Sequence, residues 1–141
     1  GAEAANGTFT KLWDANNPKN TPEEKAFAEA YSKKHGKPPA DKAWMGWITA
    51  RSLFESIDAA KSTDADKIIE ALEHWKVPAG DSSYSYRKFD HQMLVRNLAV
   101  SVKEKITDKW NFFDVKATLP ENPADLDKVF GSQEEIGCKM G

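Results

Sequence analysis

Residues 21–60, TPEEKAFAEAYSKKHGKPPADKAWMGWITARSLFESIDAA, contain the signals that decide the fold. Thr21, a proline at the first helical position and Glu24 form a capping box, which marks the start of a helix. Alanine, phenylalanine and tyrosine then recur at helical spacing until Gly36 and two nearby prolines stop the pattern. We therefore predict a helix over residues 22–35.

Two further helices follow directly. Tryptophan, isoleucine, leucine and phenylalanine make a wide apolar face over residues 41–60, so the helix predicted there must be substantially buried. The same i, i+3, i+4 spacing predicts a third helix over residues 64–75, which is capped by Ser62 or Thr63 and ends before Pro78.

Beyond Gly80 the apolar period changes from that of a helix to that of a strand. The alternation predicts strands over residues 94–102 and 110–119, joined by a polar connection, and residues 84–86 are a candidate for a third, short strand. A helical turn is expected at residues 123–129. The predicted fold is α/β, with three consecutive helices followed by two or three β-strands in a single segment of 141 residues.

The composition excludes several classes of function. With 20 Lys and Arg against 22 Asp and Glu, the chain lacks the basic footprint of a nucleic-acid-binding protein. No apolar run approaches the roughly 20 residues that a membrane-spanning helix needs. The single cysteine, Cys138, cannot close an internal disulfide or build a cysteine-rich metal site. We expect no nucleic-acid partner, no metal and no cofactor.

The local cluster most typical of an enzyme is Asp90-His91-Gln92, because a carboxylate beside an imidazole can orient it for general-base chemistry. Adjacent residues on an extended chain point to opposite faces, however, and the sequence holds no nucleophile elbow, metal-ligand spacing or glycine-rich phosphate loop. We interpret the cluster as structural. A small enzyme domain that uses Asp90 and His91 is kept as an alternative.

Trp44 and Trp47 are the candidate binding residues. They lie three residues apart on one helix face, where large aromatic rings can line a ligand cleft. The alternative is that both belong to the core of a buried helix. The charged residues of the first predicted helix are interpreted as a solvated face without a function; they are Glu23, Glu24, Lys25, Lys33 and Lys34.

Four stretches carry a family resemblance, and in chain order they are FAEAYSKKHGKPPADKAW, WITARSLFESIDAAKSTDADKIIEAL, VPAGDSSYSYRKFDHQ and LAVSVKEK. Together they resemble the carboxyl-terminal part of the type I periplasmic solute-binding proteins of ABC transporters, the Leu/Ile/Val-binding family. The resemblance implies a fragment of a fold in which two α/β lobes close over a small solute and deliver it to a membrane permease. It further implies a periplasmic location and no enzymatic activity.

The resemblance also implies a site. Members of this family hold a small amino acid, or an aromatic or carboxylate solute, between apolar and aromatic walls. The wall aromatic at the start of the long helix corresponds to Trp44 or Trp47. A helix-rich protein-interaction module without a small ligand is the alternative function.

We expect the chain to be incomplete, because the resembled fold is more than twice as long and the sequence begins Gly-Ala without an initiator methionine. An exposed sheet edge and an apolar patch should then be left for a partner. That partner would be the remaining lobe of the parent protein or a second copy, and Cys138 would find its mate in the absent lobe.

Overall fold

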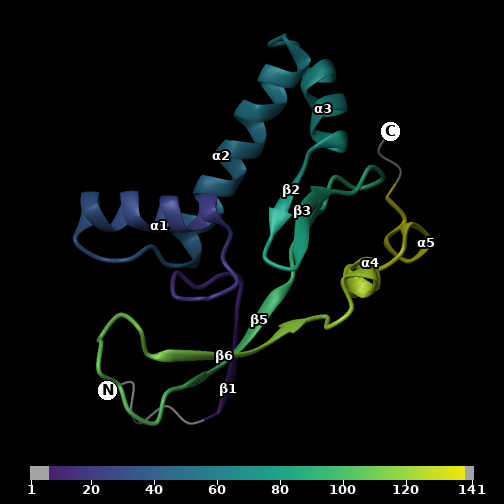
Figure 1. Cartoon of the computed structure of the whole chain (residues 1–141). Helices are drawn as coiled ribbons and strands as arrows, with labels where there is room; N and C mark the ends of the chain where they lie inside the picture. Colours follow the sequence, from purple (N-terminus) through teal and green to yellow (C-terminus); the bar gives the residue numbers. More distant parts are fainter. Residues whose placement is uncertain (1–6, 139–141) are drawn as a thin grey trace.

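The structure is a computed structural model that describes residues 7–138 (Figure 1). Its helices and strands follow the order β1(Thr8–Lys11), α1(Pro22–His35), α2(Asp41–Ala60), α3(Ala65–His74), β2(Lys76–Ala79), β3(Ser82–Tyr86), β4(Met93–Leu94), β5(Asn97–Val102), β6(Phe113–Leu119), the 3-10 helix η2(Pro123–Asp125), α4(Leu126–Val129) and α5(Gln133–Ile136). The strands form two antiparallel three-stranded sheets, β1-β5-β6 and β2-β3-β4.

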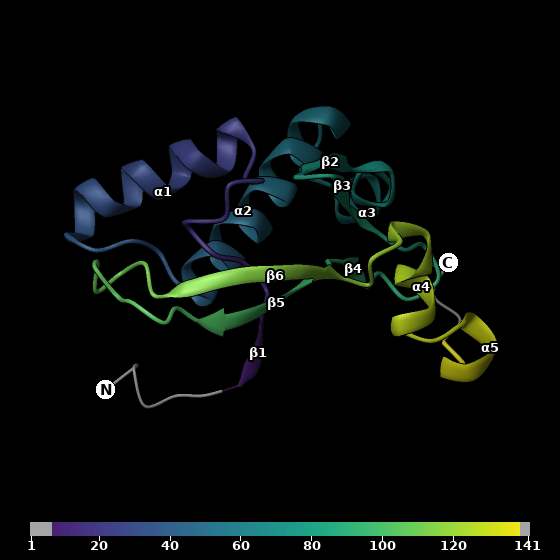
Figure 2. The ribbon, with the colours of Figure 1, turned by 60° about the horizontal axis from the view of Figure 1, so that its bottom comes forward.

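The two sheets divide the molecule into two regions. The helical region comprises α1, α2, α3 and the sheet β2-β3-β4, and the sheet region comprises β1, β5 and β6. Figure 2 shows α1 and α2 on one side and the strands of the sheet region on the other. Within the described residues the chain passes between the regions at residues 12–20, at residues 95–96 and again after β6.

The helix ends follow the local sequence signals. The Thr21 hydroxyl accepts a hydrogen bond from the Glu24 backbone N–H, and the Glu24 carboxylate accepts one from the Thr21 N–H. α1 ends at Gly36, whose left-handed backbone (φ 68°) suits glycine. α3 begins one residue later than predicted because the side chain that caps it, by accepting from the Lys67 N–H, belongs to Asp64.

The predicted strands differ from the observed ones in two ways. The strand expected over residues 94–102 is split by Val95 and Arg96 into β4 and β5, which lie in different sheets. The strand expected over residues 110–119 begins only at Phe113. β2 was not predicted, because it is short and contains Pro78, which is tolerated here on an edge strand.

The hydrophobic core lies in the helical region. Side chains from the 12–20 connection, from α2, from the end of α3 and from the β2-β3 hairpin pack together, namely Trp13, Trp44, Ile48, Trp75, Val77 and Tyr84. In the sheet region the buried side chains belong to the central strand β5 and are Leu98, Ala99 and Val100. The two regions therefore bury apolar surface to different extents.

Apolar surface and strand edges remain uncovered in the part of the chain that the structure describes. Phe54 on α2 is 67% exposed, and Met45, Leu53 and Ile69 are also exposed. β1 and β6 are the outer strands of their sheet. None of the described helices combines the length and apolar character needed to cross a membrane.

Candidate functional site

A row of aromatic rings runs from the core to the surface of α1 and α2. Trp44 stacks on Trp13 with ring centroids 6.3 Å apart, and Phe27 lies 5.9 Å from Trp13 and 4.8 Å from Trp47. Tyr31 continues the row along α1, 5.9 Å from Phe27. The row connects both candidate tryptophans through side chains of α1 and of the 12–20 connection.

The two candidate tryptophans have different environments. Trp44 is 1% exposed and packs between Trp13 and the edge of Tyr84, so its ring leaves no surface for a solute in this structure. Its indole N–H is buried without a hydrogen-bond partner among the described residues. Trp47 is half-buried, and the Arg51 guanidinium lies 5.6 Å from its ring centroid. Only Trp47 offers ring surface to a ligand.

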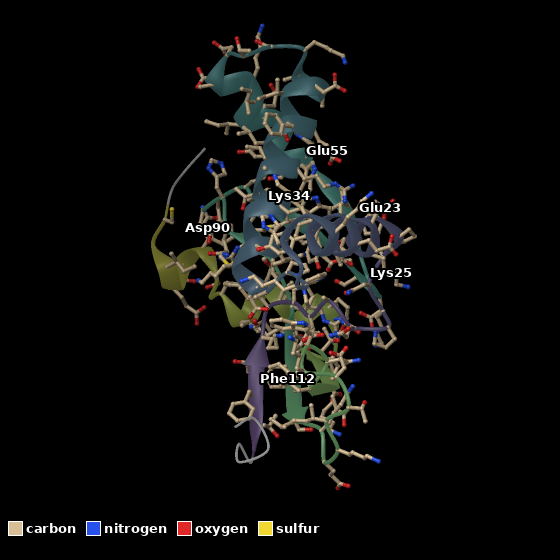
Figure 3. All side chains as sticks on the ribbon, turned by 90° about the vertical axis from the view of Figure 1, so that its left-hand side faces the viewer. Glu23, Lys25, Lys34, Glu55, Asp90 and Phe112 are labelled. Carbon is tan, nitrogen blue, oxygen red and sulfur yellow. The ribbon has the colours of Figure 1, made fainter. Side chains whose placement is uncertain are left out.

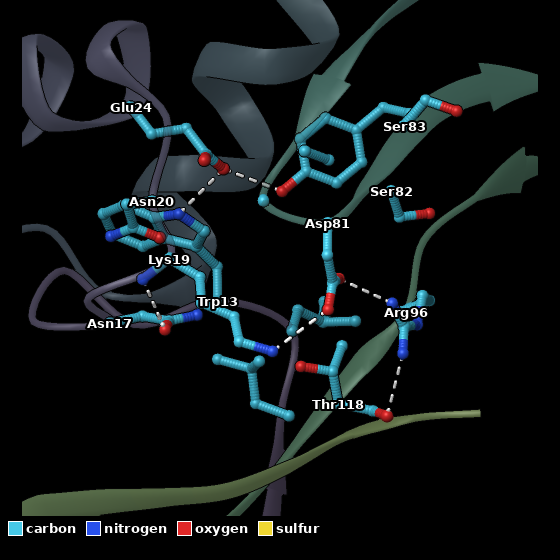
Figure 4. A pocket seen from close by; sticks show the side chains of 15 residues that line it. Trp13, Asn17, Lys19, Asn20, Glu24, Asp81, Ser82, Ser83, Arg96 and Thr118 are labelled. Atoms are coloured by element: carbon cyan, nitrogen blue, oxygen red, sulfur yellow. Dashed lines mark hydrogen bonds and ion pairs between the residues drawn. The ribbon is translucent and has the colours of Figure 1, made fainter. Parts of the chain in front are cut away.

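A small pocket lies where the helical region meets the sheet region (Figure 4). Its volume is about 40 Å³, which is room for one or two water-sized groups. Trp13, Asn20 and Glu24 line one side, and Asp81 and Arg96 line the other. We call it the junction pocket.

Glu24 is the buried acid of the junction pocket and corrects the expectation that it belongs to a solvated face. Its side chain is 2% exposed, and Oε1 accepts hydrogen bonds from the Trp13 indole N–H (3.1 Å) and the Tyr84 hydroxyl (2.7 Å). Burial, and then the negative charge of Glu24, raise the pKa of Tyr84 well above its ordinary value. By contrast, Glu23, Lys25 and Lys34 are exposed as expected (Figure 3).

Arg96 lies on the opposite side of the junction pocket. It joins its own 95–96 connection to the end of β6 and to the β2-β3 hairpin. It is 9% exposed and donates to the backbone carbonyls of Thr118, Pro120 and Glu121 at 2.8–3.1 Å. Its remaining contact is the Asp81 carboxylate, 2.7 Å away, at the turn of the β2-β3 hairpin.

Asp81 is shared between two cations. Lys19 donates to its Oδ2 at 3.0 Å while Arg96 donates to its Oδ1. The Lys19 hydrogen bond and the positive charges of both partners hold the pKa of Asp81 below its usual range, although partial burial opposes them. Gly80 precedes Asp81 in a left-handed conformation (φ 60°), and a Cβ there would lie 3.3 Å from the Lys19 carbonyl oxygen. The hairpin turn thus packs closely on the 12–20 connection.

Asp90 and His91 do not converge on a common site. Asp90 pairs with the buried Arg87, which also donates to the carbonyl oxygens of Asp127 and Gly131 and so fastens the carboxyl tail to the end of β3. His91 instead donates a hydrogen bond from Nε2 to the Glu73 carboxylate at 3.0 Å. The two side chains make separate contacts, and the interpretation of this cluster as structural stays a prediction.

Potential metal ligands do not form a cluster among the described residues. Between residues 7 and 138 there is no group of three or more His, Cys, Asp or Glu side chains placed to hold an ion. Cys138 is half-buried and unpaired within the same range.

Glu24, Arg87 and Arg96 were the important residues that sequence reasoning missed. The capping box showed only the local half of the role of Glu24, since its other partners come from Trp13 and from Tyr84, 60 residues away. The two arginines bind backbone carbonyls that are 22 to 44 residues distant in sequence. No local spacing in the sequence predicts contacts between residues so far apart.

Comparison with known proteins gives a family and a fold. A family model described as periplasmic binding protein matches residues 1–105. No curated protein matches the sequence significantly. A branched chain amino acid ABC transporter periplasmic ligand-binding protein from Burkholderia xenovorans LB400 is 22% identical, with a TM-score of 0.77 over 96% of this chain and 35% of that one.

Two other solved structures show the same fold. A periplasmic binding protein from Burkholderia mallei is 24% identical, with a TM-score of 0.73 over 88% of this chain and 33% of that one. A solute binding protein of an ABC transporter from Rhodopseudomonas palustris BisB5, in complex with 3,4-dihydroxy benzoic acid, is 19% identical, with a TM-score of 0.66 over 79% and 30%. The chain therefore spans about a third of the length of these structures.

Proposed function

This chain belongs to the periplasmic binding protein family, and on that premise we propose that it forms part of the solute-binding component of an ABC importer. The family consists of non-enzymatic transport proteins. The observation that carries the proposal is the family match over residues 1–105, supported by a fold that agrees with a solved binding protein over 96% of the chain. The component would act in the periplasm and deliver its solute to a membrane permease.

The proposed solute is a small amino acid, or an aromatic or carboxylate compound, held in a cleft between two lobes. Proteins of this fold include one named for branched chain amino acids and one complexed with 3,4-dihydroxy benzoic acid, which supports both classes. Trp47 would form part of the wall, because its ring is partly exposed and is held flat by stacking on Phe27. Trp44 would act as a positioning residue, which supports this wall through Trp13 and Phe27.

The exposed apolar side chains of α2 support the proposal that a protein partner covers this helix. Phe54 and Met45 would be covered by the remaining lobe of the binding protein or by a second copy. The same exposed face supports the second candidate, a helix-rich interaction module without a small ligand. The two candidates differ in whether a small solute stabilises the protein.

The test is thermal unfolding of the whole binding protein that contains this chain, against a panel of amino acids and aromatic acids. A true solute at 100 times its dissociation constant should add about 2.7 kcal/mol to the free energy of unfolding. Trp47→Ala should then weaken binding more than it lowers stability, while Trp110→Ala, in the exposed β5-β6 connection, serves as the matched control. A panel without any stabilising solute would favour the interaction module.

A further inference from the structure

A groove separate from the junction pocket lies between α2 and α3. These two helices form an antiparallel pair (Figure 1), and β3 contacts α3. Its volume is about 240 Å³, and the walls are the side chains of Leu53, Ile69 and Leu72. Leu53 and Ile69 are each 42% exposed, so an apolar occupant would remove surface of both from water. We call this feature the α2-α3 groove.

The α2-α3 groove lies on a different side of α2 from Trp47. On a helix with about 3.6 residues per turn, Thr49 and Leu53 point roughly 160° and 120° away from Trp47. A ligand in the α2-α3 groove would therefore touch a different side of α2 from a solute that contacts Trp47. The two sites can be tested separately.

Hydrogen-bond acceptors line the floor of the groove. The Ser52 hydroxyl has one hydrogen, and the Thr49 carbonyl oxygen lies 2.9 Å from it in position to accept. The Tyr86 hydroxyl lies 3.0 Å from the Ser52 Oγ. Because the one hydroxyl hydrogen of Ser52 is donated to Thr49, Tyr86 donates to Ser52. The lone pairs of the Tyr86 oxygen are then left to accept a bond from a ligand.

Glu73 adds a negative charge at the rim. The His91 imidazole donates to its Oε1 at 3.0 Å, and this hydrogen bond, aided by Lys88 and opposed by partial burial, holds the pKa of Glu73 below its usual range. Lys88 forms an ion pair with Oε2 at 3.6 Å, and its side chain is 63% exposed. An ammonium group in the groove would therefore share Oε2 with this exposed partner.

We propose that the α2-α3 groove binds a small hydrophobic primary amine. Its ring or branched chain would lie between Leu53, Ile69 and Leu72, and its ammonium group would donate to Glu73 and Tyr86. The size is suitable, because a cavity of about 150 Å³ holds benzene, and 240 Å³ adds room for a short arm that ends in the ammonium. The charge is complementary, since an ammonium supplies only donors and the polar groups on the floor and rim supply acceptors.

The experiment uses phenethylammonium as the probe, with 2-phenylethanol and 3-phenylpropionate as neutral and anionic compounds of similar shape. Each is titrated at constant ionic strength into the 15N-labelled whole binding protein that contains this chain, and amide chemical shifts report the site of binding. Saturable shifts are expected at residues 49–53, 69–73 and 86–91. The expected order of affinity is ammonium, then alcohol, then carboxylate.

Two variants separate charge from shape. Glu73→Gln keeps an acceptor for His91 but removes the charge, so it should weaken phenethylammonium binding about tenfold and leave phenylethanol binding within about twofold. Glu70→Gln, an exposed acid on the same helix, should change neither. Ile69→Trp fills the groove from an exposed position and should abolish binding of both probes.

The proposal is overturned if phenethylammonium produces no saturable shift, binds Glu73→Gln as tightly as the unaltered chain, or binds no better than phenylpropionate. It is also overturned if the shifts cluster around Trp47 or the junction pocket instead. None of these results bears on the importer function, which is tested with other ligands and another residue.

Discussion

The helical region and the sheet region bury their apolar residues in different ways. In the helical region, Trp44 of α2 and Tyr84 of β3 pack with Trp13 of the 12–20 connection, so side chains from three segments enclose the core. In the sheet region only the central strand β5 is buried, between outer strands that have no buried residue. The difference indicates that the helical region carries most of the stability, whereas the sheet region depends on its attachment to it.

Trp44→Ala should have the largest effect, because it removes the ring between Trp13 and Tyr84 in the enclosed core. The loss should be about 3–5 kcal/mol of unfolding free energy, as is typical for a buried tryptophan. Urea denaturation followed by far-UV circular dichroism measures it. Phe9→Ala on β1 is the matched change in the sheet region and should cost much less. Equal losses would remove the distinction between the regions.

Glu24→Ala should follow, at roughly 3 kcal/mol, because it leaves the donors of Trp13, Tyr84 and Thr21 without an acceptor in a buried place. Glu24→Gln keeps an oxygen for the first two and should cost less. Both changes remove the negative charge that helps to raise the pKa of Tyr84.

Phenolate absorbance as a function of pH checks the electrostatic part of this prediction. Because the folded-state pKa of Tyr84 is raised, its contribution to stability is present below pH 10 and is lost as the pH rises further. Glu24→Gln should make Tyr84 ionise at a lower pH than in the unaltered protein. An unchanged titration would mean that burial alone sets this pKa.

The contrast between the regions also explains what the sequence could predict. The bounds of α1 and α2 coincide with the predicted ranges because the capping box and Gly36 of α1 and the apolar spacing of both helices are local signals. The break at Val95 and Arg96 was not predicted. Arg96 interrupts the apolar alternation of Leu94 and Leu98, but one charged residue does not show that the chain changes sheet, which is a tertiary event. Exposure of Trp44 and Trp47 likewise depends on whether Trp13 or solvent covers the ring, which the spacing of two residues on one helix does not specify.

Arg96→Ala should act on the attachment between the regions, with a loss of about 2 kcal/mol, because three backbone carbonyls and Asp81 lose a charged donor. Hydrogen exchange should show reduced amide protection in β5 and β6 and unchanged protection in α2. Arg96→Lys keeps the charge beside Asp81 but lacks the planar guanidinium with its several donors, so it should recover only part of the lost unfolding free energy. Equal deprotection of α2 and β6 would contradict the separate behaviour of the two regions.

Asp81→Asn should have the smallest effect, because an asparagine keeps an oxygen for Arg96 and because Asp81 and its other partner Lys19 are both more than half exposed, and such pairs contribute less than about 1 kcal/mol. Since Lys19 and Arg96 lower the folded-state pKa of Asp81, its contribution is present above the ordinary carboxyl pKa and is lost as the pH falls through the lower, folded value. The unfolding free energies of the unaltered protein and Asp81→Asn should therefore differ at pH 7 and converge in acid. Added salt should shrink the difference at pH 7, because exposed charges are screened. A gap that persists in acid and in salt would show that Asp81 acts through the shape of the hairpin turn on the 12–20 connection, so that the regions are joined by packing rather than by charge.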